Sequence, residues 1–297
     1  MREYQHTISR PVEFSGVGLH TGVSTSARIL PAPPGTGIVF RRIDVGVEIP
    51  ATVGNVVETA FATVLSCEGA KLSTVEHFLS ALYGMEIDNA FVEVSAPELP
   101  ILDGSALEIA RAIDSAGASP QAARRRFLRV FENDRIRHNG SLITLSPSAD
   151  LEILVTVDFP GTAIGRQWAK FTLSPGSFLR EIAPSRTFVL REQIEALRAA
   201  GLARGGSLDN AIVVDGSTVH NTEGLRFPDE FARHKLLDLL GDISLLGRPL
   251  RGAFVAVRPG HTVNHALTEY LAAFGSSRIP QRRVAAGDSP EAITVTA

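Results

Sequence analysis

Apolar residues along the chain follow two spacings, one typical of helices and one typical of strands. Leu236, Leu239 and Leu240 fall at helical spacing within residues 231–242, a stretch without proline, and they predict a buried helix. Apolar and polar residues alternate in residues 25–30, 37–41 and 90–94, and this alternation predicts strands. The mixture of both spacings favours an α+β fold.

Further elements are expected on the same grounds. Helices are predicted at residues 73–83, 105–116, 191–200 and from about 263 to 274. Strands are predicted near residues 127–131, 141–145, 151–159, 211–214 and 253–257. Asn139-Gly140 and Asp215-Gly216 predict hairpin turns. Residues 16–22 are rich in glycine but predict a bent hairpin, because the lysine and the following helix of a phosphate loop are absent.

The order of elements is similar in the two halves of the chain. A helix carrying His77 leads to the strand 90–94 and a further helix, and a helix carrying His234 leads to the strand 253–257 and a further helix. We therefore expect two similar α+β domains, each a β-sheet packed with helices, with the active site at their interface. The expected segments are a first domain at 1–122, a linker-like run at 119–126 with solvated arginines, a second domain at 127–280 with a small β-α-β insertion at about 188–226, and a flexible tail at 281–297.

Composition narrows the classes of function. The 297 residues are 44% hydrophobic and 21% charged, as in an ordinary globular protein, and a net charge of −3 argues against nucleic-acid binding. The one cysteine, Cys67, excludes an internal disulfide and a cysteine-based metal cage. The N-terminus lacks the apolar core of a signal peptide, and no run approaches the ~20 apolar residues of a membrane span. We expect a cytoplasmic protein without a transmembrane segment.

The predicted helix at 231–242 carries a candidate metal site. His234, Asp238 and Asp242 are spaced four residues apart, so they share one face of the helix. An imidazole and a carboxylate one turn apart can bind the same divalent ion. The alternative is a surface ion pair with a solvated Lys235, and a third ligand elsewhere in the chain would decide against it.

Glu76 and His77 are the candidates for completing that site. They open a predicted helix and point about 100° apart around its axis, so His77 can bind a metal while Glu76 reaches a water molecule on it. Two imidazoles and one carboxylate leave a fourth position open, as catalytic zinc sites require. The alternative is a capping box, in which Glu76 only bonds back to Ser73.

His261 follows a predicted strand and turn. It is either an exposed loop histidine or a general acid, because histidine titrates near neutrality. A neighbouring Asp242 would favour its protonated form. Of the remaining histidines, His20 in the glycine-rich hairpin is the one we retain for inspection.

Several short motifs occur in a fixed order: Gly16–Gly22, Ser73–His77, Pro100–Ser105, Ser185–Phe188, Gly224–Phe227, His234–Asp238 and Gly260–His261. Through these motifs the chain resembles, from about residue 5 to about residue 275, the UDP-3-O-acyl-N-acetylglucosamine deacetylases. These are the zinc enzymes of the committed step of lipid A synthesis in Gram-negative bacteria.

The resemblance implies a role for each matching residue. His77, His234 and Asp238 would be the ligands of Zn²⁺, and Glu76 the base that acts on the zinc water. His261 would protonate the leaving amine beside Asp242, and Thr187 would hydrogen-bond the oxyanion. Lys235 and Phe188 would contact the substrate, a nucleotide-sugar lipid, and the insertion after Phe188 would enclose its acyl chain. We expect a monomer.

The chain departs from the family pattern at two places. Pro160-Gly161-Thr162 lacks a histidine that many members carry, so we assign no site residue there. Ala62 stands where members often have a cysteine near the metal. Two other readings stay open at this point: a related zinc hydrolase with another amide substrate, and a noncatalytic two-domain binding protein in which both histidines belong to the core.

Overall fold

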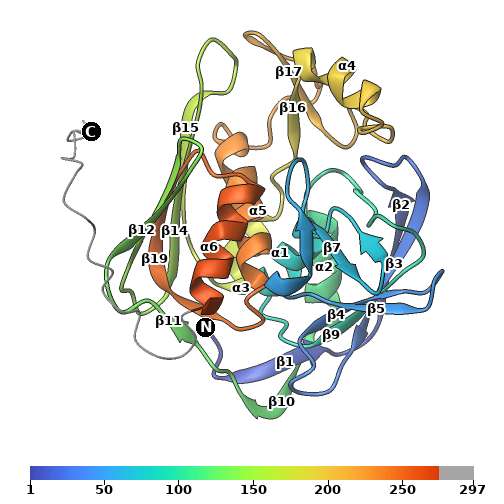
Figure 1. Ribbon diagram of the computed structural model, residues 1–297, viewed down its shortest axis with the longest axis vertical. Coiled ribbons are helices and arrows are strands. Elements are labelled where there is room, and N and C mark those ends of the chain that lie inside the picture. Colours follow the sequence, from blue (N-terminus) through green and yellow to red (C-terminus); the bar gives the residue numbers. More distant parts are fainter. Residues whose placement is uncertain (274–297) are drawn as a thin grey trace.

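Each half of the chain forms one mixed β-sheet around a central strand (Figure 1). In the first half the order is β2 (Val12–Val17), β3 (Ser24–Pro31), β9 (Ala90–Val94), β4 (Ile38–Arg42), β5 (Val47–Pro50). In the second half it is β12 (Asp134–His138), β13 (Ser141–Ser146), β19 (Leu250–Val257), β14 (Leu151–Phe159), β15 (Gly165–Thr172), with β11 (Leu128–Arg129) also pairing with β19. Both central strands run antiparallel to one neighbour and parallel to the other, so the two halves share one topology.

The computed structural model describes residues 1–273. The expected tail at 281–297, and the predicted end of the last helix at residue 274, lie outside the described residues.

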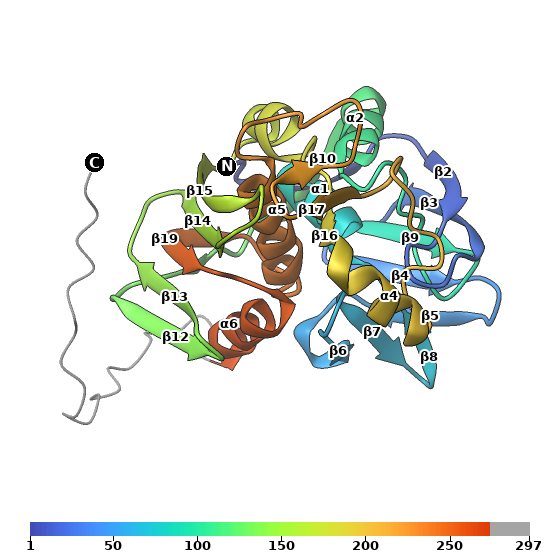
Figure 2. The same cartoon turned by 90° about the horizontal axis from the view of Figure 1, so that it is seen from above.

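The helices of the two halves, unlike the helix of the insertion, lie between the two sheets (Figure 2). The first half supplies α1 (Glu76–Gly84) and α2 (Leu107–Ala116), and the second half supplies α5 (Glu230–Ser244) and α6 (His261–Ala273). Helix α5 packs on β14 and β15, α6 packs on β12 and β13, and α1 packs directly on α5. Their apolar faces join one continuous core, in which Phe78, Leu236 and Leu240 are fully buried. The predicted α+β fold with two similar halves is confirmed.

Turn chemistry fixes the hairpins where the sequence predicts them. Asn139 and Gly140 both have positive φ, 46° and 78°, as a tight two-residue turn between β12 and β13 requires. The turn at Asp215-Gly216 likewise joins β17 (Ile212–Asp215) to β18 (Thr218–Val219). Residues 18–23 connect the antiparallel strands β2 and β3, so the glycine-rich run is a hairpin loop.

The linker expected at 119–126 is wrong in its first part. Residues Ala118–Arg124 form β10, which pairs antiparallel with β1 (Tyr4–Ile8). Arg125 is also not solvated, because its side chain is buried against Glu86 and Asp88. The segment has few large apolar residues, so its strand character comes from a distant pairing partner that local spacing does not reveal. Arg125 thus belongs with the first half, whereas Leu128 pairs with Leu250 of the second, so we propose that the domain boundary lies between Arg125 and Leu128.

The remaining short elements include a three-stranded sheet that the sequence did not predict. It comprises β6 (Val56–Glu58), β7 (Val64–Cys67) and β8 (Ala70–Leu72). A 3₁₀-turn, η1 (Val53–Asn55), precedes it, and α3 (Pro175–Ser177) with the π-helix η2 (Phe178–Ile182) follows β15.

The insertion is a β-α-β unit, as predicted, and it lies over the two halves at the top of Figure 1. It consists of β16 (Phe188–Leu190), α4 (Arg191–Ala199) and the hairpin β17–β18, with β16 parallel to β17. A loop after α4 reaches the first half, where Arg204 N donates to His20 O at 3.2 Å and Gly205 N donates to Leu19 O at 3.0 Å. A Cβ at Gly205 would lie 2.2 Å from the Gly18 carbonyl oxygen, so this roof contact between Gly18–His20 and Arg204–Gly205 requires glycine.

Candidate metal centre

Helix α5 places three polar side chains in the interior on successive turns. His234, Asp238 and Asp242 are each 2% exposed, and they follow one another at four-residue spacing between the buried leucines of the same helix. The surface ion-pair alternative for this helix is therefore wrong. Buried polar groups of this kind require partners, and their partners come from both halves of the protein.

Helix α1 presents Glu76 and His77 to the same space. The helix begins at Glu76, so Glu76 is its first residue and makes no capping box with Ser73. Its Oε2 instead accepts a hydrogen bond from Thr63 N at 3.1 Å. The capping-box alternative is wrong because Val75, not Ser73, is the N-cap of α1, and Thr74 between them has a φ of 59°.

A glycine lets the two helices meet at this point. A Cβ at Gly241 of α5 would lie 2.3 Å from the carbonyl oxygen of Glu76 and 2.9 Å from its carbonyl carbon. Backbone atoms cannot yield as a flexible side chain can, so only glycine allows α5 to pass this close to the first turn of α1. The close approach brings His77 to the face of α5 that carries His234 and Asp238.

His77, His234 and Asp238 form the one group of three or more potential ligands that lies close enough to hold a metal ion within residues 1–273. Their ligand atoms all lie within 4.8 Å of one another, and we call these three residues the metal group. Nε2 of His234 is 3.3 Å and Nε2 of His77 is 4.0 Å from Oδ1 of Asp238. Ligands at about 2.0–2.2 Å from a zinc-sized ion are separated by up to about 4 Å, so the spacing fits one ion.

The protonation states of these groups suit a cation. Burial, followed by the nearby His234, lowers the pKa of His77 to about 3, and burial also lowers the pKa of His234. Burial alone would raise the pKa of Asp238, but His234 and Lys235 outweigh it, so the net shift is downward. Two neutral imidazoles and an ionised carboxylate are the forms that bind a divalent ion.

Neighbouring groups leave the correct atoms free. Ser185 O is 3.0 Å from Nδ1 of His234, which leaves Nε2 for a metal, and Lys235 Nζ donates to Oδ2 of Asp238 at 2.8 Å, which leaves Oδ1. Within residues 1–273, Nδ1 of His77 has no hydrogen-bond partner. The residues present therefore fit a metal ion held by two nitrogens and one oxygen.

His261 and Asp242 form a hydrogen-bonded pair beside this group. His261 is the first residue of α6, and its Nδ1 lies 2.9 Å from Oδ2 of Asp242. Burial would lower the pKa of His261, but the ion pair and hydrogen bond with Asp242, and then Glu76, raise it to about 9. His261 is thus charged at neutral pH and is neither exposed nor in a loop, so the alternative of a loop histidine is wrong.

Glu76 lies between the metal group and His261. Its Oε1 is 3.8 Å from Nε2 of His261, and burial raises its pKa to about 7, although His261 opposes that shift. A carboxyl group with this pKa exchanges a proton readily near neutral pH.

Thr187, Phe188 and Lys235 line a cavity of about 900 Å³ that begins at the metal group. Thr187 is fixed by its backbone, which donates to Gly104 O at 2.7 Å and accepts from Ile212 N at 2.8 Å. Lys235 Nζ lies 5.4 Å from the centroid of the Phe188 ring. His20 also lines the cavity, near Phe61.

The cavity continues under the insertion along an apolar wall. Ile194 and Leu197 of the predicted α4 stripe, Leu208 and Val213 belong to its lining. None of the residues of α4 is fully buried, so the stripe only partly packs on its own strands and partly faces the cavity.

Sequence spacing missed several residues of the site. Thr63 Oγ1 donates to Oδ1 of Asp242 at 2.5 Å, and Asn264 Nδ2 donates to its Oδ2 at 2.9 Å. Asn264 follows His261 by three residues, so helical spacing could have indicated it once the helix start was known. Thr63 comes from a segment without any chemical signal of its own.

The comparison with known families decides between the remaining readings. The sequence pattern described as UDP-3-O-acyl N-acetylglycosamine deacetylase matches residues 5–273. The chain belongs to this family.

Relatives of the chain support the same assignment. It is 46% identical over 299 residues to the UDP-3-O-acyl-N-acetylglucosamine deacetylase of Anaeromyxobacter sp. (strain Fw109-5), covering 97% of this chain and 98% of the relative. The protein of the same name from Myxococcus xanthus is 45% identical, with 89% and 84% covered, and that of Alcanivorax borkumensis is 44% identical, with 89% and 88% covered. None of the helices within residues 1–273 combines the length and apolar character needed to span a membrane.

Proposed function

We propose that this protein hydrolyses the acetamide of UDP-3-O-acyl-N-acetylglucosamine to give UDP-3-O-acyl-glucosamine and acetate, the committed step of lipid A biosynthesis. The observation that carries the proposal is the convergence of His77, His234 and Asp238, drawn from both halves, beside Glu76 and His261. The substrate is the one after which the relatives are named.

His77, His234 and Asp238 would hold the metal ion of the enzyme. Zinc suits this set of two nitrogens and one oxygen best, and iron(II) is the alternative. When bound, such an ion polarises the acetamide carbonyl and makes water more acidic.

Glu76 would act as the general base. Its carboxylate takes a proton from the attacking water, and its pKa of about 7 suits this transfer near neutral pH. The hydroxyl of Thr187 donates to the oxyanion that develops on the substrate carbonyl.

His261 would act as the general acid. Asp242 accepts the hydrogen bond from Nδ1–H, so the proton on Nε2 is available to the leaving nitrogen. When the C–N bond breaks, this proton converts the leaving group to an amine, and the acyl half leaves as acetate.

The apolar part of the cavity would hold the acyl chain. Each methylene buried there contributes about 0.8 kcal/mol, so a chain of about ten carbons can dominate recognition. Binding far from the acetamide also raises the rate if it holds the reacting group in place. Lys235 and Phe188, at the head of the cavity, would contact the sugar end of the substrate.

A deacetylation assay tests the proposal. UDP-3-O-acyl-N-acetylglucosamines of several chain lengths, and the chainless UDP-N-acetylglucosamine, are offered to metal-depleted and zinc-restored protein. We expect acetate release only from restored protein, and faster release with longer chains. Activity that is indifferent to the metal would contradict the metal centre, and equal rates with and without the chain would contradict the acyl passage.

Substituting one residue in the apolar wall of the cavity tests the acyl-chain part of this proposal separately. Ile194→Asp places a charge in the apolar wall, so we expect a selective loss with long-chain substrates and little change with the chainless one. Ala199→Asp is the matched control, because Ala199 lies on the same helix, is exposed and does not line the cavity. Equal losses in both variants would show a general effect on α4.

A cytoplasmic location and a monomeric state remain predictions of the sequence.

A further inference from the structure

A buried ion pair lies directly behind the metal group. Arg186 and Glu230 have side chains that are 2% and 0% exposed, and they meet through two hydrogen bonds, Nε to Oε1 at 2.9 Å and Nη2 to Oε2 at 3.2 Å. Removing two charges from water opposes folding, and apolar residues in the same place are often as stable. Stability alone is therefore a weak explanation for this pair.

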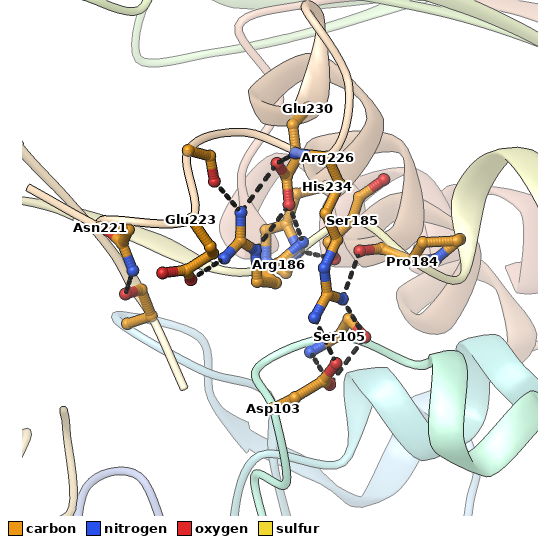
Figure 3. A network of polar contacts seen from close by, with 12 residues as sticks. Asp103, Ser105, Pro184, Ser185, Arg186, Asn221, Glu223, Arg226, Glu230 and His234 are labelled. Atoms are coloured by element: carbon orange, nitrogen blue, oxygen red, sulfur yellow. Dashed lines mark hydrogen bonds and ion pairs between the residues drawn. The ribbon is translucent and has the colours of Figure 1, made fainter. Parts of the chain in front are cut away.

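The pair makes further hydrogen bonds to the chain around it, and Figure 3 shows Arg186 at the centre of the network. Glu230 also accepts from the backbone N–H groups of Arg186, at 3.1 Å, and of Arg226, at 2.6 Å. Two further N–H groups of the Arg186 guanidinium bond to Gly224 O at 2.7 Å and to Glu223. Glu230 is the first residue of α5, so two separate loops are fixed to the start of the helix that carries His234 and Asp238.

The chain neighbours of Arg186 are the residues that touch the site. Ser185 O contacts Nδ1 of His234, one helical turn after Glu230, and Thr187 lines the cavity. Arg186 does not line the cavity, but its side chain joins the segment 185–187 to Glu230 at the start of α5.

The same network reaches the first half of the protein. Arg226 contacts Oδ2 of Asp103 at 2.9 Å and donates to Pro184 O at 2.9 Å (Figure 3). Gly104 O, next to Asp103, accepts from Thr187 N. The segment 185–187 is therefore held on one side by α5 and on the other by the loop that carries Asp103.

We propose that Arg186 and Glu230 are positioning residues, which set the Ser185 carbonyl and the Thr187 hydroxyl in register with His234 and Asp238. This inference rests on the proposed function. It predicts that breaking the pair weakens metal binding, because His234 loses its orientation, and slows the chemical step, because Thr187 shifts from the reacting carbonyl.

A second buried pair in the same chain provides the matched control. Arg125 is 4% exposed and pairs with Glu86, 3% exposed, at 3.1 Å. The two pairs match in chemistry and burial, but neither Arg125 nor Glu86 lines the metal-site cavity. A purely structural role would make Arg186→Met and Arg125→Met behave alike.

The experiment measures Co²⁺ affinity and the visible Co²⁺ spectrum of each variant, then kcat and KM at saturating metal. For Arg186→Met we expect Co²⁺ affinity to fall roughly 10–100-fold, with an altered spectrum and a lower kcat. For Arg125→Met we expect a lower Tm with Co²⁺ affinity and kcat unchanged. An Arg186→Met protein with normal Co²⁺ affinity, spectrum and kcat overturns the proposal.

The double variant Arg186→Met/Glu230→Gln is a control for misfolding of the Arg186→Met protein. It removes both charges and keeps an acceptor for the backbone N–H groups, so stability should recover while weak Co²⁺ binding and low kcat persist. Recovery of both functions together with Tm would overturn the positioning role. Unmodified protein that binds Co²⁺ but releases no acetate would contradict the proposed function instead, and the Co²⁺ affinities would still test the pair.

Discussion

The two halves of the molecule share a strand order but supply the site in different ways. In the first half, the nine-residue α1 offers two adjacent residues from its first turn, Glu76 and His77. In the second half, the 15-residue α5 offers His234, Asp238 and Asp242, each separated by about one turn. The same order of strands therefore carries its site residues at the start of a helix in the first half and along one face of a helix in the second half.

The difference shows that two halves with the same topology can direct their side chains in two ways, toward different atoms or toward the same one. Adjacent helical residues diverge by about 100°, so Glu76 and His77 can address different atoms. Residues four apart lie along one face, so His234 and Asp238 can address the same ion and Asp242 can address His261. Under the proposed function, the first half combines base and ligand, and the second half combines ligands with the support of the acid.

Removing one ligand from each half is the strongest test of this comparison. We expect His77→Ala and His234→Ala each to lose bound metal and activity, by more than the roughly 10–100-fold that loss of a supporting contact costs. Metal content and acetate release measure the effect, with His138→Ala, which does not line the cavity, as control. Stoichiometric metal in the double variant His77→Ala/His234→Ala would refute a site shared between the halves.

Glu76→Gln separates the two residues of α1. The variant keeps the shape of the side chain and His77, so metal content should be normal while the rate falls by about two to four orders of magnitude. Little stability should be lost, because Glu76 forms no capping box. Normal turnover combined with a lower Tm would instead assign Glu76 a structural task alone.

Gly241→Ala tests whether the helices must meet closely. The added methyl group would collide with the backbone of Glu76, and such overpacking costs about 1–3 kcal/mol of the free energy of unfolding. The rate should fall by up to about 100-fold at saturating metal, because α1 moves relative to α5. Gly54→Ala, where a Cβ meets no atom within 4 Å, is the control for Tm and kcat. Unchanged activity in Gly241→Ala would show that the site tolerates a wider separation.

Asp242→Asn addresses the support that α5 gives to His261. Under the proposed function, activity requires protonated His261, and Asp242 is the main group that raises its pKa to about 9. Losing the carboxylate lowers that pKa, so the proton is lost earlier and the basic limb of kcat/KM against pH moves to lower pH. Thr268→Val is the control, because Thr268 donates to the backbone oxygen of Asp242 and leaves the carboxylate intact. A basic limb that stays in place would remove His261 as the titrating acid.

The part of the candidate metal site on α5 could be predicted from the sequence, because helical periodicity fixes relative directions within one element. Spacing alone placed His234, Asp238 and Asp242 on one face of a helix. The capping-box alternative for Glu76 could be excluded only from the structure, because the start of α1 depends on the left-handed conformation of Thr74. The expected role of Thr187 came only from the family resemblance. His261 was a candidate acid by residue type, and the resemblance favoured that role over an exposed loop histidine.

Contacts between distant segments were beyond such reasoning. Thr63 reaches Asp242 across 179 positions, and Arg186 reaches Glu230 across 44. Strand β10 was missed because its pairing with β1, more than a hundred residues earlier, and not its own apolar pattern, makes it a strand. Elements that depend on a partner for their identity carry little local signal.

The roof contact has a consequence for how substrate enters and leaves. The insertion is covalently part of the second half, yet Arg204 and Gly205 hydrogen-bond to His20 and Leu19 of the first half. Hinge motion that drew the halves apart would stretch these bonds. If the apolar part of the cavity holds the acyl chain as proposed, the chain would therefore enter lengthwise beneath the insertion while these bonds stay closed. Backbone amide exchange at Arg204 and Gly205 would report any transient opening, and its rate would then set an upper limit on sideways release of the product.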